Sequence, residues 1–179
     1  MKKSREASTN STYKRIDVPL SIICILSDFV FEKTQQTRFS LLFRKIYPVF
    51  DREIFVIDNY HSEWRNIYDK KKLWCSDPIV NIHRRSEPTS IAWGDDFFEG
   101  YSELLKHGED FGFKYGVSFV INTLHGYECI ISLSNNSCNI TSQQLSLCEL
   151  YYTDIYNTII NLSLPHLADT NSFTLMPPV

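Results

Sequence analysis

The stretch FSLLFRKIYPVFDREIFVI, residues 39–57, decides the fold. Two short runs within it, residues 39–46 and 53–57, are rich in aromatic and β-branched side chains, and Pro48 with Asp51 separates them. This composition predicts two strands of a hairpin. A second pair of strands is expected at residues 117–122 and 127–134, joined by a turn that contains Gly126. Strands that come in hairpin pairs predict an antiparallel sheet.

Helical patterns lie before, between and after these strands. Asp17 and Pro19 predict the start of a strongly apolar helix, because Asp suits an N-cap and Pro a first turn. Two more helices are expected over residues 61–72 and from Asp95 to about His107. The predicted fold class is therefore α/β (α+β): an α-β-α sandwich with a central antiparallel sheet of about five strands and helices on both faces, similar in general shape to GAF and PAS domains.

The last helix is expected to begin at the capping-box pattern Thr141-x-x-Gln144 and to end at Pro165. Its apolar residues recur at alternating steps of three and four. That spacing favours packing on the sheet, although a seam with a second subunit uses the same spacing. The apolar stripe consists of Leu145, Cys148, Tyr152, Ile155, Ile159 and Leu162.

Length and composition predict a single domain in a reducing compartment. The chain has 179 residues, of which 43% are hydrophobic, and no apolar run approaches the ~18 residues that span a bilayer. Five cysteines without a CxxC pair indicate free thiols. We expect a cytoplasmic protein with a flexible arm over residues 1–15, one domain over residues 16–167 and a linker-like tail over residues 168–179.

The sequence carries no pattern typical of catalysis, of a metal site or of DNA binding. HExxH, GxSxG, the Walker loop and GxGxxG do not occur, and the five histidines are dispersed without metal-ligand spacing. The net charge is −3, without the clustered basic face of a duplex-binding module. We therefore expect that the chain is not an enzyme, uses no metal or cofactor and does not contact DNA by itself.

The most informative stretch is NYHSEWRNIYDKKKLWCSDP, residues 59–78. Tyr60, Trp64 and Tyr68 recur every four residues, so they lie on one face of a helical turn and of the segment entering it. On spacing alone, an ordinary core is the favoured interpretation. Asp77 stands beside Pro78, and the apolar residues Ile79 and Val80 follow. An acid in that position is exposed, capped or buried against hydrogen-bond donors.

Taken together, these residues resemble the autoinducer-binding domain of the LuxR family of quorum-sensing regulators. The similarity runs from about residue 39 to residue 164 and lies in the joint spacing of the set rather than in any one residue. It favours the enterobacterial branch of that family. The matching positions are Tyr60, Trp64, Tyr68, Asp77-Pro78-Ile79-Val80, Trp93 and Gly116.

The resemblance implies a pocket for an N-acyl-homoserine lactone. By position, Trp64 would donate its indole N–H to the lactone carbonyl, and Asp77 would accept from the ligand amide N–H. Tyr60 would donate to the amide carbonyl, with the Ser132 hydroxyl placed to help. The remaining side chains expected to wall the pocket are Tyr68, Trp93, Phe98 and Phe113, with Ile54, Val56, Val80 and Ile130 along the acyl tail.

The resemblance also implies partners and leaves alternatives open. Family members form dimers and bind DNA through a C-terminal helix-turn-helix domain; we expect a homodimer, no membrane contact, and DNA contact only through such a domain, which this chain does not include. One alternative is an orphan or truncated receptor that senses a different small molecule or acts as a dimerising decoy. Another is a ligand-free interaction module of the GAF or PAS kind.

Overall fold

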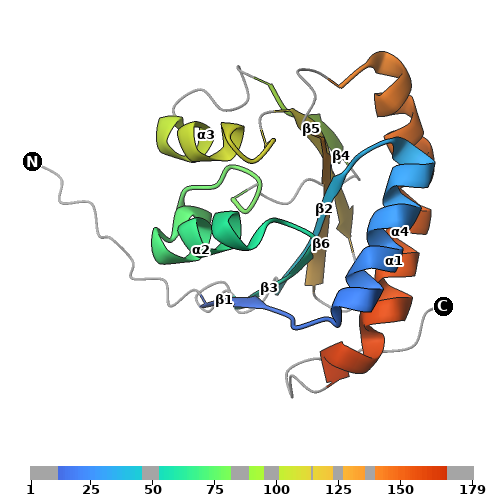
Figure 1. Cartoon of the computed structure of the whole chain (residues 1–179), viewed down its shortest axis with the longest axis horizontal. Helices are drawn as coiled ribbons and strands as arrows, with labels where there is room; N and C mark the ends of the chain where they lie inside the picture. The colour runs from blue at the N-terminus through green and yellow to red at the C-terminus, as the bar shows by residue number, and fades with distance from the viewer. Residues whose placement is uncertain are drawn as a thin grey trace, which may run out of the picture.

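The fold is described from a computed structural model of the chain. The described residues are 12–45, 53–81, 89–94, 101–113, 115–122, 127–135 and 140–168. Within them, six strands form one open sheet with helices on both sides, so the predicted α-β-α sandwich is confirmed (Figure 1).

The sheet has the strand order β1-β3-β2-β6-β5-β4. The two predicted hairpins form its centre: β2 pairs antiparallel with β3, and β5 pairs antiparallel with β6. The pairing of β2 with β6 joins the two hairpins, again antiparallel. The strands are β1 (Thr12–Arg15), β2 (Arg38–Lys45), β3 (Glu53–Asp58), β4 (Thr89–Ala92), β5 (Gly116–Asn122) and β6 (Tyr127–Ser134).

Two long helices cover one face of the sheet, and shorter helices cover the other (Figure 1). On the first face, α1 (Leu20–Thr34) packs beside α4 (Ser142–Ala168). On the second face lie α2 (Ser62–Lys70), the short 3-10 helix η1 (Leu73–Cys75) and α3 (Ser102–Glu109). The side chains between sheet and helices therefore form two separate apolar layers.

Alternation along the strands assigns each residue to one of these layers, because successive strand side chains point to opposite faces. On β3, Phe55 and Ile57 belong to the layer under α1 and α4, whereas Ile54 and Val56 belong to the layer under α2 and α3. All four are buried, and each buried side chain of this size contributes about 1.5–3 kcal/mol of transfer free energy.

The last helix, α4, packs on the sheet, which is the arrangement that the spacing of its apolar residues favoured. Cys148, Ile155 and Ile159 are buried in the layer beneath α1 and α4. The predicted capping box is also present: the Thr141 backbone N–H donates to Gln144 Oε1 over 3.0 Å, and the Gln144 N–H donates to Thr141 Oγ1 over 3.2 Å.

Pro165 does not end α4, which continues to Ala168. A proline removes one backbone bond, here to the carbonyl of residue 161, and fewer than four residues of helix follow it. Because the loss falls in the last turn, the helix continues through it. The predicted N-cap of α1 is also wrong: Pro19 occupies the cap position, and its carbonyl accepts from the N–H groups of Ile22 and Ile23.

Two edge strands were not predicted. Residues 12–15, placed at the end of the expected flexible arm, form β1, which pairs parallel with β3; the sheet is therefore not wholly antiparallel. At the opposite edge, Thr89–Ala92 form β4 against β5. Both strands are only four residues long, so the alternation of apolar and polar side chains is too brief to reveal them. The predicted start of the third helix at Asp95 lies outside the described residues, and α3 is described from Ser102.

Candidate functional site

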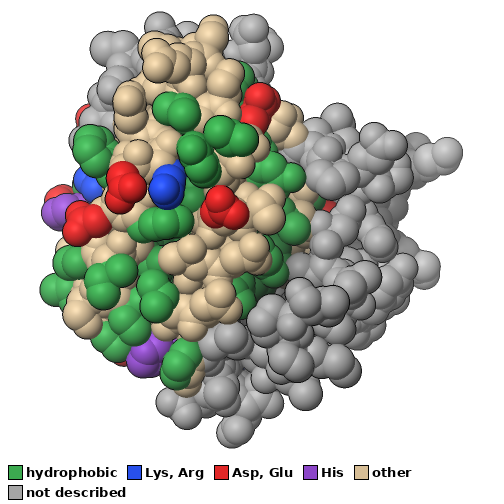
Figure 2. Space-filling model, turned by 90° about the vertical axis from the view of Figure 1, so that its right-hand side faces the viewer, with side chains coloured by type: hydrophobic (Ala, Val, Ile, Leu, Met, Phe, Trp, Pro, Cys, Tyr) green, Lys and Arg blue, Asp and Glu red, His purple; other side chains and the backbone are tan. Residues whose placement is uncertain are grey.

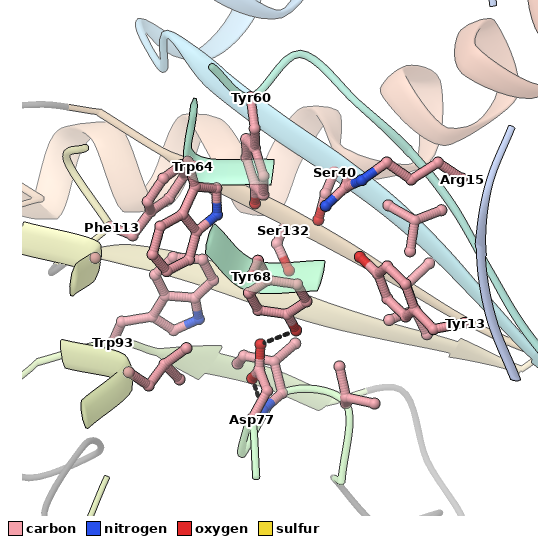
Figure 3. A pocket seen from close by; sticks show the side chains of 16 residues that line it. Tyr13, Arg15, Ser40, Tyr60, Trp64, Tyr68, Asp77, Trp93, Phe113 and Ser132 are labelled. Carbon is pink, nitrogen blue, oxygen red and sulfur yellow. Dashed lines mark hydrogen bonds between the residues drawn. The ribbon is translucent and has the colours of Figure 1, made fainter. Parts of the chain in front are cut away.

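A pocket lies between the sheet and the helices α2 and α3 (Figure 3). The cavity volume is about 70 Å³, which is small beside the roughly 300–1,000 Å³ of typical ligand pockets. The walls therefore have to move apart to admit a molecule with a long apolar chain. The lining residues are Tyr13, Arg15, Ser40, Leu42, Val56, Tyr60, Trp64, Tyr68, Asp77, Ile79, Val80, Trp93, Leu104, Gly108, Phe113 and Ser132.

The aromatic residues spaced by four form one wall of this pocket. Trp64 and Tyr68 are buried on the inner face of α2 with ring centroids 5.6 Å apart. Tyr60 precedes the helix and meets Phe113 edge-on at 4.4 Å, while Trp64 lies 5.0 Å from the same ring. Offset and edge-on contacts of this kind each stabilise by about 0.5–1.5 kcal/mol beyond the buried area. The interlocked rings hold the polar ends of Tyr60 and Trp64 in fixed directions.

Asp77 faces the pocket from the loop that follows η1 (Figure 3). The Tyr68 hydroxyl donates to Asp77 Oδ2 over 2.6 Å, and the Ile79 backbone N–H donates to Oδ1 over 2.7 Å. Pro78 has no N–H, so Ile79 supplies the first backbone donor after the acid. Burial raises the pKa of Asp77 above its ordinary value, and these hydrogen bonds lower it in part. An ionised carboxyl group has about four acceptor positions, so it keeps room for a donor from the pocket beside these bonds.

A chain of hydrogen bonds crosses the sheet beneath the pocket. The Trp93 indole N–H donates to Ser118 Oγ over 3.0 Å, and 2.8 Å separates Ser118 Oγ from Ser132 Oγ. Ser118 and Ser132 are direct cross-strand partners on β5 and β6. Because the indole can only donate, the Ser118 proton is free to point at Ser132, which leaves the Ser132 proton for the pocket.

Gly116 allows Trp93 to lie against the sheet. A Cβ at position 116 would stand 2.5 Å from the Leu133 carbonyl oxygen and 2.8 Å from the Trp93 ring. The Trp93 backbone N–H also donates to the Gly116 carbonyl over 2.8 Å. Gly116, which the sequence marked as a position matching the family, therefore serves this close approach between ring and backbone.

The edge strand β1 closes the pocket with Tyr13 and Arg15. Tyr13 stacks on Trp74 with centroids 5.8 Å apart and lies 5.7 Å from Tyr68. Arg15 forms an ion pair with Asp58, whose side chain is almost fully buried.

Asp58 also orders the segment that carries Tyr60. Its Oδ1 accepts from the Tyr60 backbone N–H over 3.0 Å and from Arg65 Nε over 2.7 Å. Burial raises the pKa of Tyr60 above its usual range, so the phenol keeps its proton as a donor.

Most of the residues predicted for the site line this pocket. The exceptions are Ile54 and Ile130, which are buried in the same apolar layer without lining the pocket, and Phe98, which lies outside the described residues. The predicted residues found in the lining are Val56, Tyr60, Trp64, Tyr68, Asp77, Val80, Trp93, Phe113 and Ser132.

Sequence reasoning missed several lining residues. Ser40 and Leu42 alternate on a strand that was predicted, so the period of two could have identified them. Tyr13 and Arg15 were missed because β1 was taken for part of the arm. Leu104 lies on the apolar face of the helix predicted from Asp95 to about His107, so the helical period could have identified it, whereas no sequence signal pointed to Gly108.

Among the residues that the structure describes, no group of His, Cys, Asp or Glu is arranged to hold a metal ion. The helices described here also include none long and apolar enough to cross a membrane.

Two proteins from the comparison of sequences are transcriptional activators. LuxR of Aliivibrio fischeri is 29% identical over 136 residues, which cover 72% of this chain and 50% of that protein. TraR of Rhizobium radiobacter is 26% identical over 90 residues, covering 48% of this chain and 38% of that protein. The chain thus spans half or less of the length of these relatives. These similarities confirm the expectation that it is not an enzyme.

Solved structures show the same fold at lower identity. SdiA in complex with octanoyl-rac-glycerol superposes with a TM-score of 0.63 at 20% identity, covering 91% of this chain and 64% of that one. CepR2 of Burkholderia cenocepacia, described as an N-acylhomoserine lactone dependent LuxR family factor, gives a TM-score of 0.61 at 16% identity, covering 83% and 98%. At such identities the likeness concerns the fold, so the enterobacterial branch stays a prediction.

The comparison with family models covers the central part of the chain. The model described as the autoinducer binding domain matches residues 37–151, which include both hairpins, α2, the Asp77 loop and the first part of α4. That span is more than half of the sequence, and the chain therefore belongs to the autoinducer-binding domain family of LuxR-type regulators.

Proposed function

We propose that this domain binds an N-acyl-homoserine lactone and is the sensory part of a cytoplasmic LuxR-type transcription regulator. One observation carries the proposal: Tyr60, Trp64 and Asp77 line a single pocket. A lactone amide needs one acceptor for its N–H and donors for its carbonyls, and this trio supplies that set of groups.

Each polar group of the ligand has a matching residue in this proposal. The Asp77 carboxylate accepts from the amide N–H, the Tyr60 hydroxyl donates to the amide carbonyl with help from Ser132, and the Trp64 indole N–H donates to the lactone carbonyl. The aromatic rings of Tyr68, Trp93 and Phe113 surround the head group. A hydrogen bond to a charged partner contributes about 1.5–3 kcal/mol net, so the Asp77 contact makes the largest single polar contribution to the binding free energy.

The acyl tail supplies apolar burial. Val56 and Val80 line the pocket with Leu42 and Ile79, which offer the tail an apolar wall. Each buried methylene contributes about 0.8 kcal/mol, so the depth to which the walls open decides the preferred tail length.

A second candidate ligand is a monoacylglycerol, because the similar SdiA structure is described in complex with octanoyl-rac-glycerol. Such a ligand has an acyl chain and hydroxyl donors but no amide N–H. Asp77 could accept from a hydroxyl in the same place, so the two ligand classes compete for the same residues.

A thermal-shift series tests these candidates against each other. The protein is melted alone, with lactones of four- to twelve-carbon tails, and with octanoylglycerol. Binding only to the folded form stabilises it by about 2.7 kcal/mol at one hundred times the dissociation constant, and this raises the melting temperature. A rise with lactones supports the proposal, and a rise with octanoylglycerol alone favours the second candidate. A folded protein whose melting temperature rises with neither ligand class contradicts both candidates, and the ligand-free interaction module is then the remaining alternative.

We also propose that two copies of the chain associate through α1 and α4. Large apolar side chains stand exposed on these helices, among them Phe31, which is 55% exposed, and Leu150, which is 67% exposed. Figure 2 shows this face, where apolar side chains are interspersed with acidic ones. Light scattering after size exclusion should give the mass of a dimer, and Phe31→Glu should shift it to that of a monomer. A wild-type protein that is monomeric at high concentration contradicts this proposal.

A further inference from the structure

The edge strand β1 contributes two side chains to the pocket wall. Tyr13 and Arg15 are two residues apart, so they point to the same face of the sheet, whereas Lys14 between them is exposed. In the parallel pairing, Tyr13 lies opposite Ile54, and Arg15 lies opposite Val56, which also lines the pocket. Arg15 therefore places a guanidinium group at the end of the pocket where the apolar tail is expected (Figure 3).

The hydrogen bonds of Arg15 leave part of its donor capacity unused. Its Nε donates to Asp69 Oδ2 over 3.2 Å, Nη2 donates to Asp69 Oδ1 over 3.3 Å, and Nη1 donates to Asp58 Oδ2. A guanidinium carries five N–H groups. Among the described residues, these bonds engage one N–H on each nitrogen, so each terminal nitrogen keeps a second N–H without a protein acceptor.

The charges around Arg15 indicate which kind of acceptor fits. Arg15 and Arg65 both contact Asp58, and Arg15 also contacts Asp69, so two cations face two anions. This group is already balanced. Asp77 adds a carboxyl group to the same pocket, which disfavours an anionic ligand. A neutral oxygen is therefore the acceptor that suits the spare N–H groups.

The position of Arg15 relative to Tyr60 indicates where on the ligand this oxygen lies. Asp58 accepts from Arg15 and from the Tyr60 backbone N–H, so one carboxylate holds both residues. Ser40 and Tyr60 both line the pocket as well. If the amide carbonyl meets Tyr60, the first carbons of the tail pass beside Arg15.

We propose that Arg15 is a specificity-determining residue that selects lactones with a keto or hydroxyl oxygen at the 3-position of the acyl tail. The inference rests on the proposed function. One buried hydrogen bond from a charged donor corresponds to a preference of roughly tenfold for the oxygen-bearing tail.

The test compares N-octanoyl-, N-(3-oxooctanoyl)- and N-(3-hydroxyoctanoyl)-homoserine lactone by calorimetric titration. The wild-type chain should bind the two oxygen-bearing ligands roughly tenfold more tightly than the plain one. In Arg15→Met this ratio should fall to about one. Lys14→Met, on the opposite face of the same strand, is the matched control and should keep the wild-type ratio.

Arg15→Lys covers the case in which Arg15→Met does not fold. It keeps a cation opposite Asp58, but a single ammonium cannot contact both acids and the ligand with the fork geometry of arginine, so most of the preference should be lost. If the wild-type chain binds all three lactones equally, or if both Arg15 variants keep the wild-type ratio, the inference is overturned and the proposed function stands. A folded wild-type chain that binds none of the three overturns both.

Discussion

The hydroxyl of Tyr68 donates a 2.6 Å hydrogen bond to Oδ2 of Asp77, and it thereby links the aromatic face of α2 to the acidic loop. The two residues are nine positions apart in the sequence, and η1 brings them together. This bond fixes the direction of the carboxyl group that we assign to the ligand amide. Lactone binding should therefore respond to changes in this pair more than to changes in any other contact of the pocket.

Replacing Asp77 with Asn should weaken lactone binding by about tenfold to a hundredfold, because a charged acceptor is lost from a buried site. Calorimetric titration measures the effect. Asp154→Asn, an exposed acid on α4, is the matched control and should leave affinity unchanged. Equal affinity in wild type and Asp77→Asn would mean that Asp77 does not bind the amide.

The stability of the same variant should depend on pH in a defined direction. Burial raises the pKa of Asp77 above the unfolded value of 3.8, so the folded carboxyl binds its proton more tightly than the unfolded one. The wild-type free energy of unfolding therefore falls as pH rises from the unfolded pKa through the folded pKa. Asp77→Asn lacks this loss, so its melting temperature should rise relative to wild type across that window. A relative decrease would contradict the direction of the shift.

Tyr68→Phe should make lactone binding more sensitive to acid. The Tyr68 hydrogen bond lowers the pKa of Asp77, so its removal raises that pKa further. The amide acceptor is then lost at a higher pH, and affinity measured over a pH series should begin to fall earlier than in wild type. Tyr152→Phe, where the ring stacks on Phe119 beneath α4, should follow the wild-type curve. Coincident curves for wild type and Tyr68→Phe would show that the bond does not tune Asp77.

Gly116→Ala should destabilise the fold by about 1–3 kcal/mol, because the new methyl group would stand 2.5 Å from the Leu133 carbonyl oxygen and force Trp93 away from the sheet. Chemical denaturation measures the change. Gly94→Ala is a well-matched control, since a Cβ there meets nothing within 4 Å. If both variants unfold at the same denaturant concentration, the close approach at Gly116 does not restrict the size of the side chain at that position.

Tyr13→Ala should shift the ligand preference toward longer tails. Tyr13 stands in the pocket wall at the sheet edge, and its removal opens space beyond the present cavity. Each added methylene that is buried contributes about 0.8 kcal/mol, so the optimum tail in a lactone series should lengthen by two or more carbons. An unchanged optimum would place the tail away from β1.

The sequence predicted those parts of the site that lie on strongly patterned elements. Trp64 and Tyr68 follow the helical period of α2, and Val56 follows the alternation of β3, so each was assigned to the correct face. The capping box at Thr141 likewise marked the start of α4. In these segments local periodicity and tertiary packing require the same arrangement.

The remaining parts depend on long-range pairing that the local sequence does not encode. Tyr13 and Arg15 reach the pocket only because TYKR pairs with β3, some forty residues later in the chain. Their polar segment has no period that separates an edge strand from a loose arm. Gly116 matched the family's spacing, but its close contact with Trp93 depends on the pairing of β4 with β5.

Calorimetric titration of the wild-type chain with N-octanoyl-homoserine lactone and its 3-oxo analogue tests the central claim most directly. We predict saturable binding of one lactone per chain, with a negative heat-capacity change from burial of the acyl tail. Absence of binding by a folded protein to lactones of any tail length would contradict it.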